Sequence, residues 1–209
     1  MDSKFTFFLL IVSSIIFSQK KNEKFFDEDI SIKYEKVPAS DVGIGVMGSF
    51  DKQAYATFVG SNVAEKNQQY FHYIKFKSIN FTENSSQIYL CIYKNNRGLP
   101  GEILEGAKFL VNIPAHKSFV TADLSKLKIK VPENGYFVGF EWVLSKENEM
   151  KGKISAAKLP YNPTISGFTD NKVNLYSRSK EWRRQQDSDL VAGLALEISY
   201  FQLTSDKIE

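Results

Sequence analysis

The stretch "SQIYLCIYK", residues 86–94, decides the fold class, because its side chains alternate between two faces. One face carries the aliphatic side chains of Ile88, Leu90 and Ile92. The opposite face carries Tyr89, Cys91 and Tyr93. Such a period of two predicts a β-strand. Cys91 is the only cysteine, so the chain cannot form an internal disulfide, and we expect a buried, inert thiol there.

Similar short segments rich in Tyr, Phe, Ile and Val recur along the chain, separated by clusters of Gly, Pro, Asn and Ser. About ten strands are expected, which is enough for two packed sheets. One short helical turn is expected near 61–69. The sequence predicts an all-β protein, an antiparallel β-sandwich of jelly-roll-like form, with a closed barrel as the lesser option. The other expected strands are 44–48, 54–60, 69–81, 108–113, 118–124, 126–131, 135–144, 153–159, 172–177 and 193–203.

The amino-terminal residues have the pattern of a secretory signal peptide. One lysine, Lys4, precedes an apolar run from Phe5 to Phe17, and Ser18 and Gln19 then form the expected cleavage site. The run is shorter than the about 20 residues that a membrane helix needs. We therefore expect a signal peptide at 1–18, a charged tether at 19–30 and one β-sandwich domain at 31–209, with no stable membrane insertion after cleavage.

The charge balance argues against one class of partner. The chain has 27 basic and 24 acidic residues and a formal net charge of +3. This small excess is not the basic surplus that neutralises many phosphates, so nucleic-acid binding is not expected.

Three stretches occur in an order that resembles a module of exported Bacteroidota proteins. They are "LCIYKNNRGLPGEIL" at 90–104, "VTADLSKLKIKVPENGYFVGFEWV" at 120–143 and "NLYSRSKEWRRQ" at 174–185. This uncharacterised family is often found behind carboxypeptidase-regulatory-like domains. The resemblance implies a jelly-roll-like sandwich without an established catalytic role. It also implies an exported location, in the periplasm or associated with the outer membrane. We expect no carboxypeptidase-regulatory-like domain before this module, so that the module stands alone.

Two glutamates lie in apolar strands, Glu141 in "GFEWV" and Glu197 in "LALEISY". Alternation places Glu141 on the face opposite Trp142. A glycoside hydrolase needs two carboxyl groups about 5 to 10 Å apart, and these two could serve if their strands were neighbours. The alternative, which we favour, is that each glutamate lies on a half-solvated sheet face or pairs with a lysine or arginine across the strands.

The sequence gives little support for a metal site or a catalytic nucleophile. The two histidines, His72 and His116, have no ligand spacing typical of zinc. Alternation predicts that His72 shares the apolar face of Ile74 and Phe76, as a core-edge residue. No metal or other cofactor is expected, although loop oxygens could hold a structural calcium ion. Those oxygens belong to Asp170, Asn171, Asp187 and Asp189.

The densest cationic stretch is "YSRSKEWRRQQ", residues 176–186. Trp182 could stack on a sugar ring while Arg178, Arg183 and Arg184 contact an anionic polysaccharide. The alternative is a hairpin in which Trp182 packs against the sandwich and the arginines are solvated. These four residues are our candidate ligand-binding residues.

The sequence therefore predicts an exported, non-catalytic binding or structural module of the cell envelope, whose partner is an envelope protein or polysaccharide. A carbohydrate-binding module is the alternative, and a glycoside hydrolase using Glu141 and Glu197 comes third. No catalytic residue is assigned.

Overall fold

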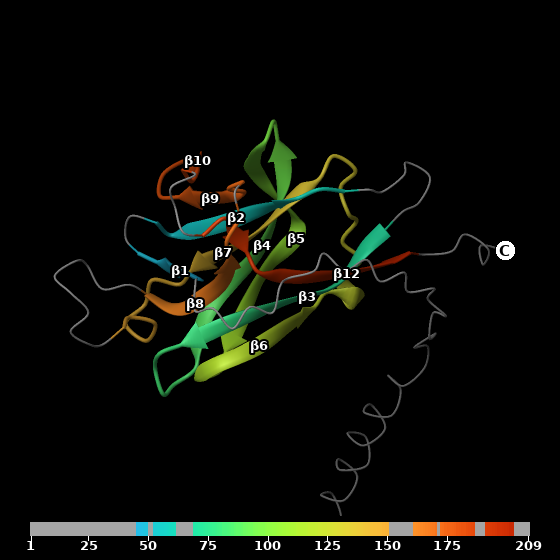
Figure 1. The fold of residues 1–209 in the computed structure, drawn as a ribbon. Coiled ribbons are helices and arrows are strands. Elements are labelled where there is room, and N and C mark those ends of the chain that lie inside the picture. Colours follow the sequence, from blue (N-terminus) through green and yellow to red (C-terminus); the bar gives the residue numbers. More distant parts are fainter. Residues whose placement is uncertain are drawn as a thin grey trace, which may run out of the picture.

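The computed structural model describes residues 45–49, 52–61, 69–150, 161–170, 172–186 and 191–202. Figure 1 draws the rest of the chain as a thin grey trace. Several predictions fall outside the described residues: the signal peptide at 1–18, the tether at 19–30, the strand at 153–159, most of the helical turn near 61–69, and three possible calcium ligands, Asn171, Asp187 and Asp189.

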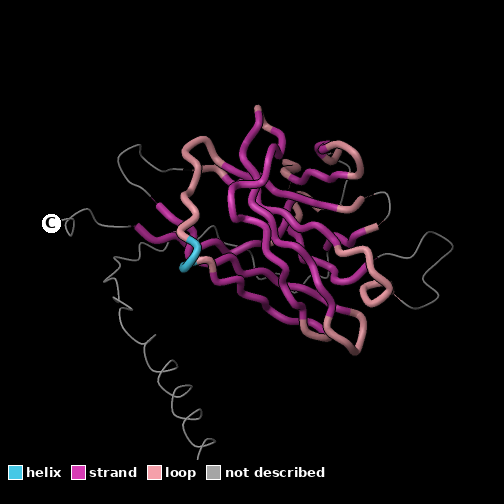
Figure 2. Tube along the Cα trace, turned by 180° about the vertical axis from the view of Figure 1, so that it is seen from behind, coloured by secondary structure: helices cyan, strands magenta, loops and turns pink. Residues whose placement is uncertain are grey.

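Strands dominate the described residues, with one short helical turn, η1 (Ser125–Leu127), which is cyan in Figure 2. The strands are β1 (Gly45–Gly48), β2 (Ala54–Val59), β3 (Gln69–Asn80), β4 (Ser86–Asn96), β5 (Leu99–Ile113), β6 (His116–Asp123), β7 (Tyr136–Trp142), β8 (Tyr161–Phe168), β9 (Leu175–Arg178), β10 (Trp182–Arg184), β11 (Gly193–Leu194) and β12 (Leu196–Gln202).

These strands form two antiparallel sheets that pack face to face (Figure 1). In the first, here the β3 sheet, the order is β1-β8-β3-β12, while β6 pairs with β3 and β11 pairs with β8. In the second, here the β7 sheet, the order is β10-β9-β2-β7-β4-β5. The sheets do not close into a barrel within the described residues. The prediction of an all-β antiparallel sandwich is confirmed.

Strand β4 shows why its sequence is so informative. Ile88, Leu90 and Ile92 face the core between the sheets, and Cys91 and Tyr93 are buried in a second, smaller cluster on the outer face. Both faces of this strand are thus covered, which requires apolar residues at nearly every position. The hairpin that leads into β5 turns through residues 97 and 98, both with positive φ, as a tight two-residue turn demands.

Aromatic rings fill the core between the sheets. The rings of Phe76 and Phe140 meet edge to face at 4.7 Å, joining β3 to β7 across the sandwich. Trp142 is buried, and its indole nitrogen donates a hydrogen bond to the carbonyl of Pro163 at 2.8 Å. Burying a side chain of this size stabilises the fold by about 1.5–3 kcal/mol. The core therefore supplies the stability that disulfides cannot.

The prediction that His72 shares the face of Ile74 and Phe76 is wrong, because a β-bulge interrupts the alternation of β3. Ser199 pairs with Tyr73, but the next residue, Tyr200, pairs with Phe71, so His72 is the extra residue. The bulge turns Phe71 into the core and leaves His72 half-buried on the outer face. A bulge of this kind adds one residue to one strand and shifts the faces beyond it.

The prediction of a strand at 126–131 is also wrong. Residues 125–127 form the turn η1, and Lys128 adopts a left-handed conformation with φ of 50°. Only a single bridge, between Tyr70 and Lys130, attaches the segment to β3. Leu127 is 50% exposed, whereas Ile129 and Val131 are buried. The alternation of apolar residues is real, but the left-handed residue breaks the extended backbone that a strand needs.

Candidate functional site

Glu141 on β7 is the centre of an ion network on the outer face of the β7 sheet. Its Oε1 accepts hydrogen bonds from the Tyr93 hydroxyl at 2.8 Å and from Arg178 Nη2 at 2.6 Å. Its Oε2 accepts one from Lys108 Nζ at 2.7 Å. The side chain is only 13% exposed. The prediction that this glutamate pairs with a basic residue across the strands is confirmed.

Burial alone would raise the pKa of the Glu141 carboxyl. The hydrogen bonds from Lys108 and Tyr93 and the charge of Arg178 outweigh burial and hold this pKa below its ordinary value of 4.5. The bond to Glu141 raises the pKa of Lys108, while burial raises the pKa of the Tyr93 hydroxyl. The carboxylate thus stays ionised at neutral pH, and it is poorly suited to act as a general acid.

A second group of apolar side chains, here the outer-face cluster, surrounds this network. Three neighbouring strands carry small residues in register: Ala56, Gly139 and Cys91. Their size leaves room for the Trp182 ring on β10 to reach the Tyr93 ring on β4, at a centroid distance of 5.2 Å. The cluster consists of Ala56, Cys91, Tyr93 and Phe137, with Phe58, Tyr89, Ile103, Tyr176 and Trp182 packed against them.

Trp182 is half-buried in this cluster, and the guanidinium of Arg178 lies 5.0 Å from its ring centroid. Arg178 therefore contacts both the Trp182 ring and the Glu141 carboxylate. These contacts attach the β9–β10 hairpin to the centre of its sheet. Cys91 lies beneath them, and burial raises the pKa of its thiol to about 12, which agrees with the inert thiol that the sequence predicts.

Glu197 does not share a cleft with Glu141. It lies on β12 in the β3 sheet, where it accepts hydrogen bonds from the Tyr73 hydroxyl at 2.8 Å and from Lys75 at 3.3 Å. Its neighbours Leu196 and Ile198 face the core, so Glu197 faces outward from the β3 sheet. Because Glu141 faces outward from the β7 sheet, the core separates the two carboxylates. This arrangement does not fit a pair of hydrolytic carboxyl groups.

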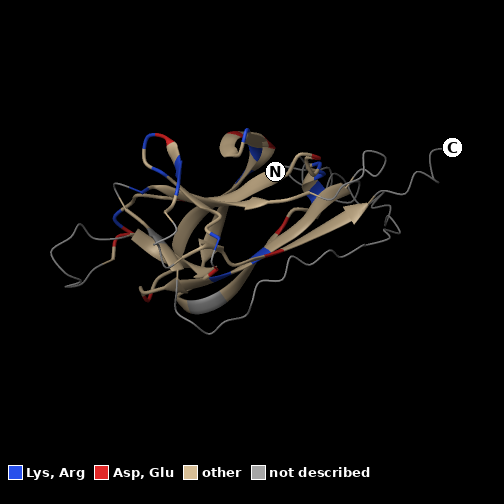
Figure 3. Ribbon diagram, turned by 45° about the horizontal axis from the view of Figure 1, so that its top comes forward, with Lys and Arg blue, Asp and Glu red and all other residues tan. Residues whose placement is uncertain are grey.

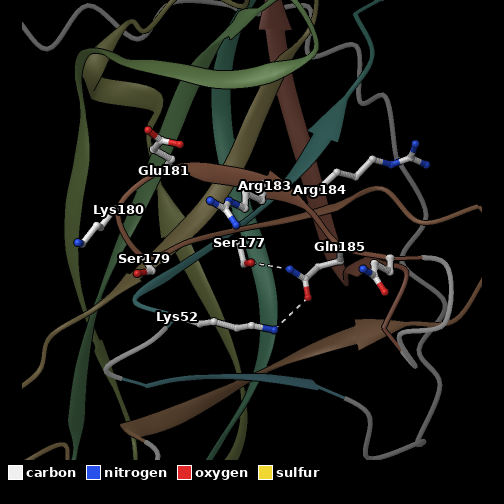
Figure 4. Close-up of a pocket in the computed structure, with 9 residues that line it drawn as sticks. Lys52, Ser177, Ser179, Lys180, Glu181, Arg183, Arg184 and Gln185 are labelled. Carbon is white, nitrogen blue, oxygen red and sulfur yellow. Dashed lines mark hydrogen bonds between the residues drawn. The ribbon is translucent and has the colours of Figure 1, made fainter.

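A polar hollow of about 620 Å³ lies beside the β9–β10 hairpin (Figure 4). In it, Lys52 donates a hydrogen bond to Gln185 Oε1 at 3.1 Å, and Gln185 Nε2 donates to the Ser177 hydroxyl. This hairpin hollow is lined by Lys52, Ser177, Ser179, Lys180, Glu181, Arg183, Arg184, Gln185 and Gln186.

The charged residues that line the hairpin hollow are mostly basic. The lining carries four basic residues, Lys52, Lys180, Arg183 and Arg184, against the single acidic residue Glu181. Figure 3 shows charged residues in the loops and hairpins and also along the strands. The hollow thus presents several positive donors at the edge of the β7 sheet, where an anion can approach from solvent.

The four candidate ligand-binding residues do not form one surface. Trp182 pairs with Arg178 across the hairpin, and Arg178 contacts both the Trp182 ring and Glu141. Arg183 instead pairs with Ser177 and lines the hollow. Arg184 also lines the hollow, but its guanidinium donates to the carbonyl of Val173 and extends away from Arg183 (Figure 4). Arg183 and Arg184 are both exposed, and both line the hollow.

Sequence reasoning missed Lys52 and Gln185, which complete the hollow. Lys52 precedes β2 by two residues and is far from the hairpin in the sequence. The pairing of Ala54 with Arg178 brings the two regions together. No local pattern reveals this, because it depends on which strands are neighbours.

Among the described residues, no three His, Cys, Asp or Glu side chains gather into a group that could hold a metal ion. Nor does that part of the chain contain a helix of the length and hydropathy needed to cross a membrane.

No family model and no curated protein matches this sequence. One similar solved structure contains the cysteine protease and lectin-like domains of Cwp84, a surface layer associated protein of Clostridium difficile. The two chains are 7% identical, with a TM-score of 0.48, over 74% of this chain and 32% of the other. This chain thus spans about a third of that protein's length. A likeness of this size identifies neither a family nor a function, and the resemblance to Bacteroidota modules stays a prediction.

Proposed function

We propose that this protein is an exported, non-catalytic binding module of the cell envelope, and that it binds an anionic polysaccharide in the hairpin hollow. The observation that carries the proposal is the hollow itself, which is open to solvent and lined by positive and hydroxyl or amide side chains. Its volume of about 620 Å³ lies within the range of roughly 300–1,000 Å³ that is usual for small-ligand sites.

The chemistry of the lining favours an acidic sugar. The Arg183 guanidinium offers a planar fork of donors that fits a carboxylate or a sulfate, and Lys180 adds a second positive charge. Ser177 and Gln185 also line the hollow and offer groups that hydrogen-bond with sugar hydroxyls. A polyhydroxylated anion therefore matches the lining better than an apolar ligand does.

The two glutamates embedded in strands support a binding role over a hydrolytic one. Glu141 is held by two cations and a hydroxyl, and Glu197 is held by Lys75 and Tyr73 on the other sheet. Both carboxylates are engaged in contacts within the sheets. The expected signal peptide at 1–18 supports export, and an envelope polysaccharide is a ligand that an exported module would meet.

The proposal is tested by comparing wild type with Arg183→Gln on an array of acidic and neutral glycans. Arg183 is exposed, so its replacement leaves the fold intact and removes one cation from the hollow. The matched control is Lys94→Gln, which removes one cation from a solvent-exposed pair with Glu102 on β4 and β5.

We expect wild type and Lys94→Gln to bind acidic glycans and Arg183→Gln to bind them at least tenfold more weakly. Tight binding to neutral glycans alone, or equal binding by all three proteins, would show that the hollow is not the site. The variant Trp182→Ala is less suitable, because it also removes the contact with Tyr93.

A further inference from the structure

The outer face of the β3 sheet carries an exposed aromatic ring between two lysines. Phe119 on the edge strand β6 is 60% exposed. The ammonium groups of Lys75 and Lys77 lie 5.4 Å and 5.7 Å from its ring centroid. A single exposed apolar residue is common on protein surfaces, but a ring held between two cations is a more specific arrangement.

Strand register explains how these three residues meet. In the pairing of β3 with β6, Phe119 lies opposite Lys77, and Lys75 lies opposite Thr121. The next residue of β6, Val120, faces the core, so alternation turns Phe119 and Thr121 outward. Lys75 and Lys77 are two residues apart on one strand, which separates their Cα atoms by about 7 Å along the sheet.

Neighbouring contacts hold this face in place before any ligand arrives. Glu197 on β12 accepts hydrogen bonds from Lys75 at 3.3 Å and from the Tyr73 hydroxyl at 2.8 Å. Lys75 therefore contacts a carboxylate on one side and the Phe119 ring on the other. A side chain fixed in this way loses less conformational entropy on binding than a free lysine does.

We propose that Phe119, Lys75 and Lys77 form a second contact surface for an acidic polysaccharide whose units are uronic acids. The apolar face of one pyranose ring stacks on Phe119, and carboxylates of the polymer pair with the lysine ammonium groups. Thr121 stands on the same face and offers a hydroxyl to the sugar hydroxyls. The two lysine ammonium groups beside the ring favour ligands that carry carboxylates, while the ring favours a sugar over a simple anion.

This surface is separate from the hairpin hollow, which belongs to the β7 sheet. In Figure 1, β6 lies at the lower side of the molecule and β10 at the upper side. The inference rests on the proposed function only for the class of ligand. One polymer chain, or two different chains, would thus contact opposite sides of the module.

The test uses isothermal titration calorimetry of the mature chain with oligogalacturonate. The variants are Phe119→Ala, Arg183→Gln and the control Leu127→Ala, which removes another exposed apolar side chain close to β6. The comparison ligands are methyl-esterified oligogalacturonate, which has the same rings without charge, and poly-L-glutamate, which has charge without rings. Circular dichroism and thermal unfolding check that each variant is folded.

We expect Phe119→Ala to weaken oligogalacturonate binding by about fivefold or more, because base and sugar rings commonly stack on exposed aromatic side chains. Leu127→Ala should bind as wild type does, and both comparison ligands should bind at least tenfold more weakly. Equal binding by Phe119→Ala and wild type would overturn the inference, as would equal binding of poly-L-glutamate.

The Arg183→Gln arm separates the two proposals. Loss of binding in Arg183→Gln together with unchanged binding in Phe119→Ala would retain the hairpin hollow and remove the Phe119 surface. Loss in Phe119→Ala alone would support the Phe119 surface and show that oligogalacturonate does not bind in the hollow. A wild-type protein that does not bind oligogalacturonate would overturn the inference made here, while other acidic glycans would still test the hollow.

Discussion

Replacing Glu141 with glutamine should destabilise the protein by about 1–2 kcal/mol. The substitution keeps the shape of the side chain but removes the charge that three donors contact, at 2.8, 2.7 and 2.6 Å. A hydrogen bond to a charged group contributes about 1.5–3 kcal/mol when it is well buried. Lys108 and Arg178 are 42% and 30% exposed, so solvent screening lowers their share to about 0.2–1 kcal/mol each.

The loss of unfolding free energy is measured by urea denaturation, which is monitored by tryptophan fluorescence and circular dichroism. For a domain of this size a change of 1 kcal/mol shifts the melting temperature by about 2–4 °C, so a shift of several degrees is expected. The control is Glu102→Gln, whose partner Lys94 lies 3.3 Å away in an exposed pair. Glu102→Gln should lower the free energy of unfolding by less than about 0.5 kcal/mol.

The pH dependence gives the prediction a second readout. The pKa of Glu141 in the folded protein lies below its ordinary value of 4.5, so its contribution to stability is complete above that value. The contribution is lost as the pH falls through the lower pKa of the folded state. The difference in stability between wild type and Glu141→Gln should therefore shrink on acidification below pH 4.5. A difference no larger than that of Glu102→Gln at neutral pH would refute the reasoning.

Three other predictions concern the same sheet. Gly139→Ala should destabilise the protein by about 1–3 kcal/mol in urea titrations, because the added Cβ would lie 2.5 Å from the backbone oxygen of Tyr55; a neutral effect would contradict the packing. Cys91 should react with Ellman's reagent only after unfolding, since burial raises the pKa of its thiol to about 12, and rapid labelling of the native protein would disprove this. Arg178→Gln should increase acrylamide quenching of Trp182 fluorescence in a Trp142→Phe background, because Arg178 links that ring to Glu141; unchanged quenching would count against the link.

The fold class follows from the sequence where both faces of a strand are apolar. Alternation in β4 and β7 places Ile88, Leu90 and Trp142 on the core side and Tyr93 and Glu141 on the outer side, and the structure agrees. The same method fails where the backbone departs from regular extension. The bulge at His72 and the left-handed Lys128 change the path of the chain without changing the apolar pattern.

The site residues could be predicted only in part, because sites in this sandwich are made across strands. Arg183 was recognisable from the basic hairpin, but its partner residues Lys52 and Gln185 depend on β2 being next to β9. Nothing in the sequence indicated that Phe119 is an exposed site residue, since a phenylalanine in a strand normally faces a core. Its exposure follows from the register of β6 on β3, which sequence alone does not determine.

The central claim is that the hairpin hollow binds an acidic glycan, and NMR chemical-shift mapping tests it most directly. The isotope-labelled mature chain is titrated with acidic oligosaccharides chosen from the array. The account predicts shifts for the backbone amides of Ser177, Arg183 and Gln185 and for Lys52, which saturate together and disappear in Arg183→Gln. Binding that shifts only residues outside the hollow, or the absence of shifts at millimolar ligand, would contradict it.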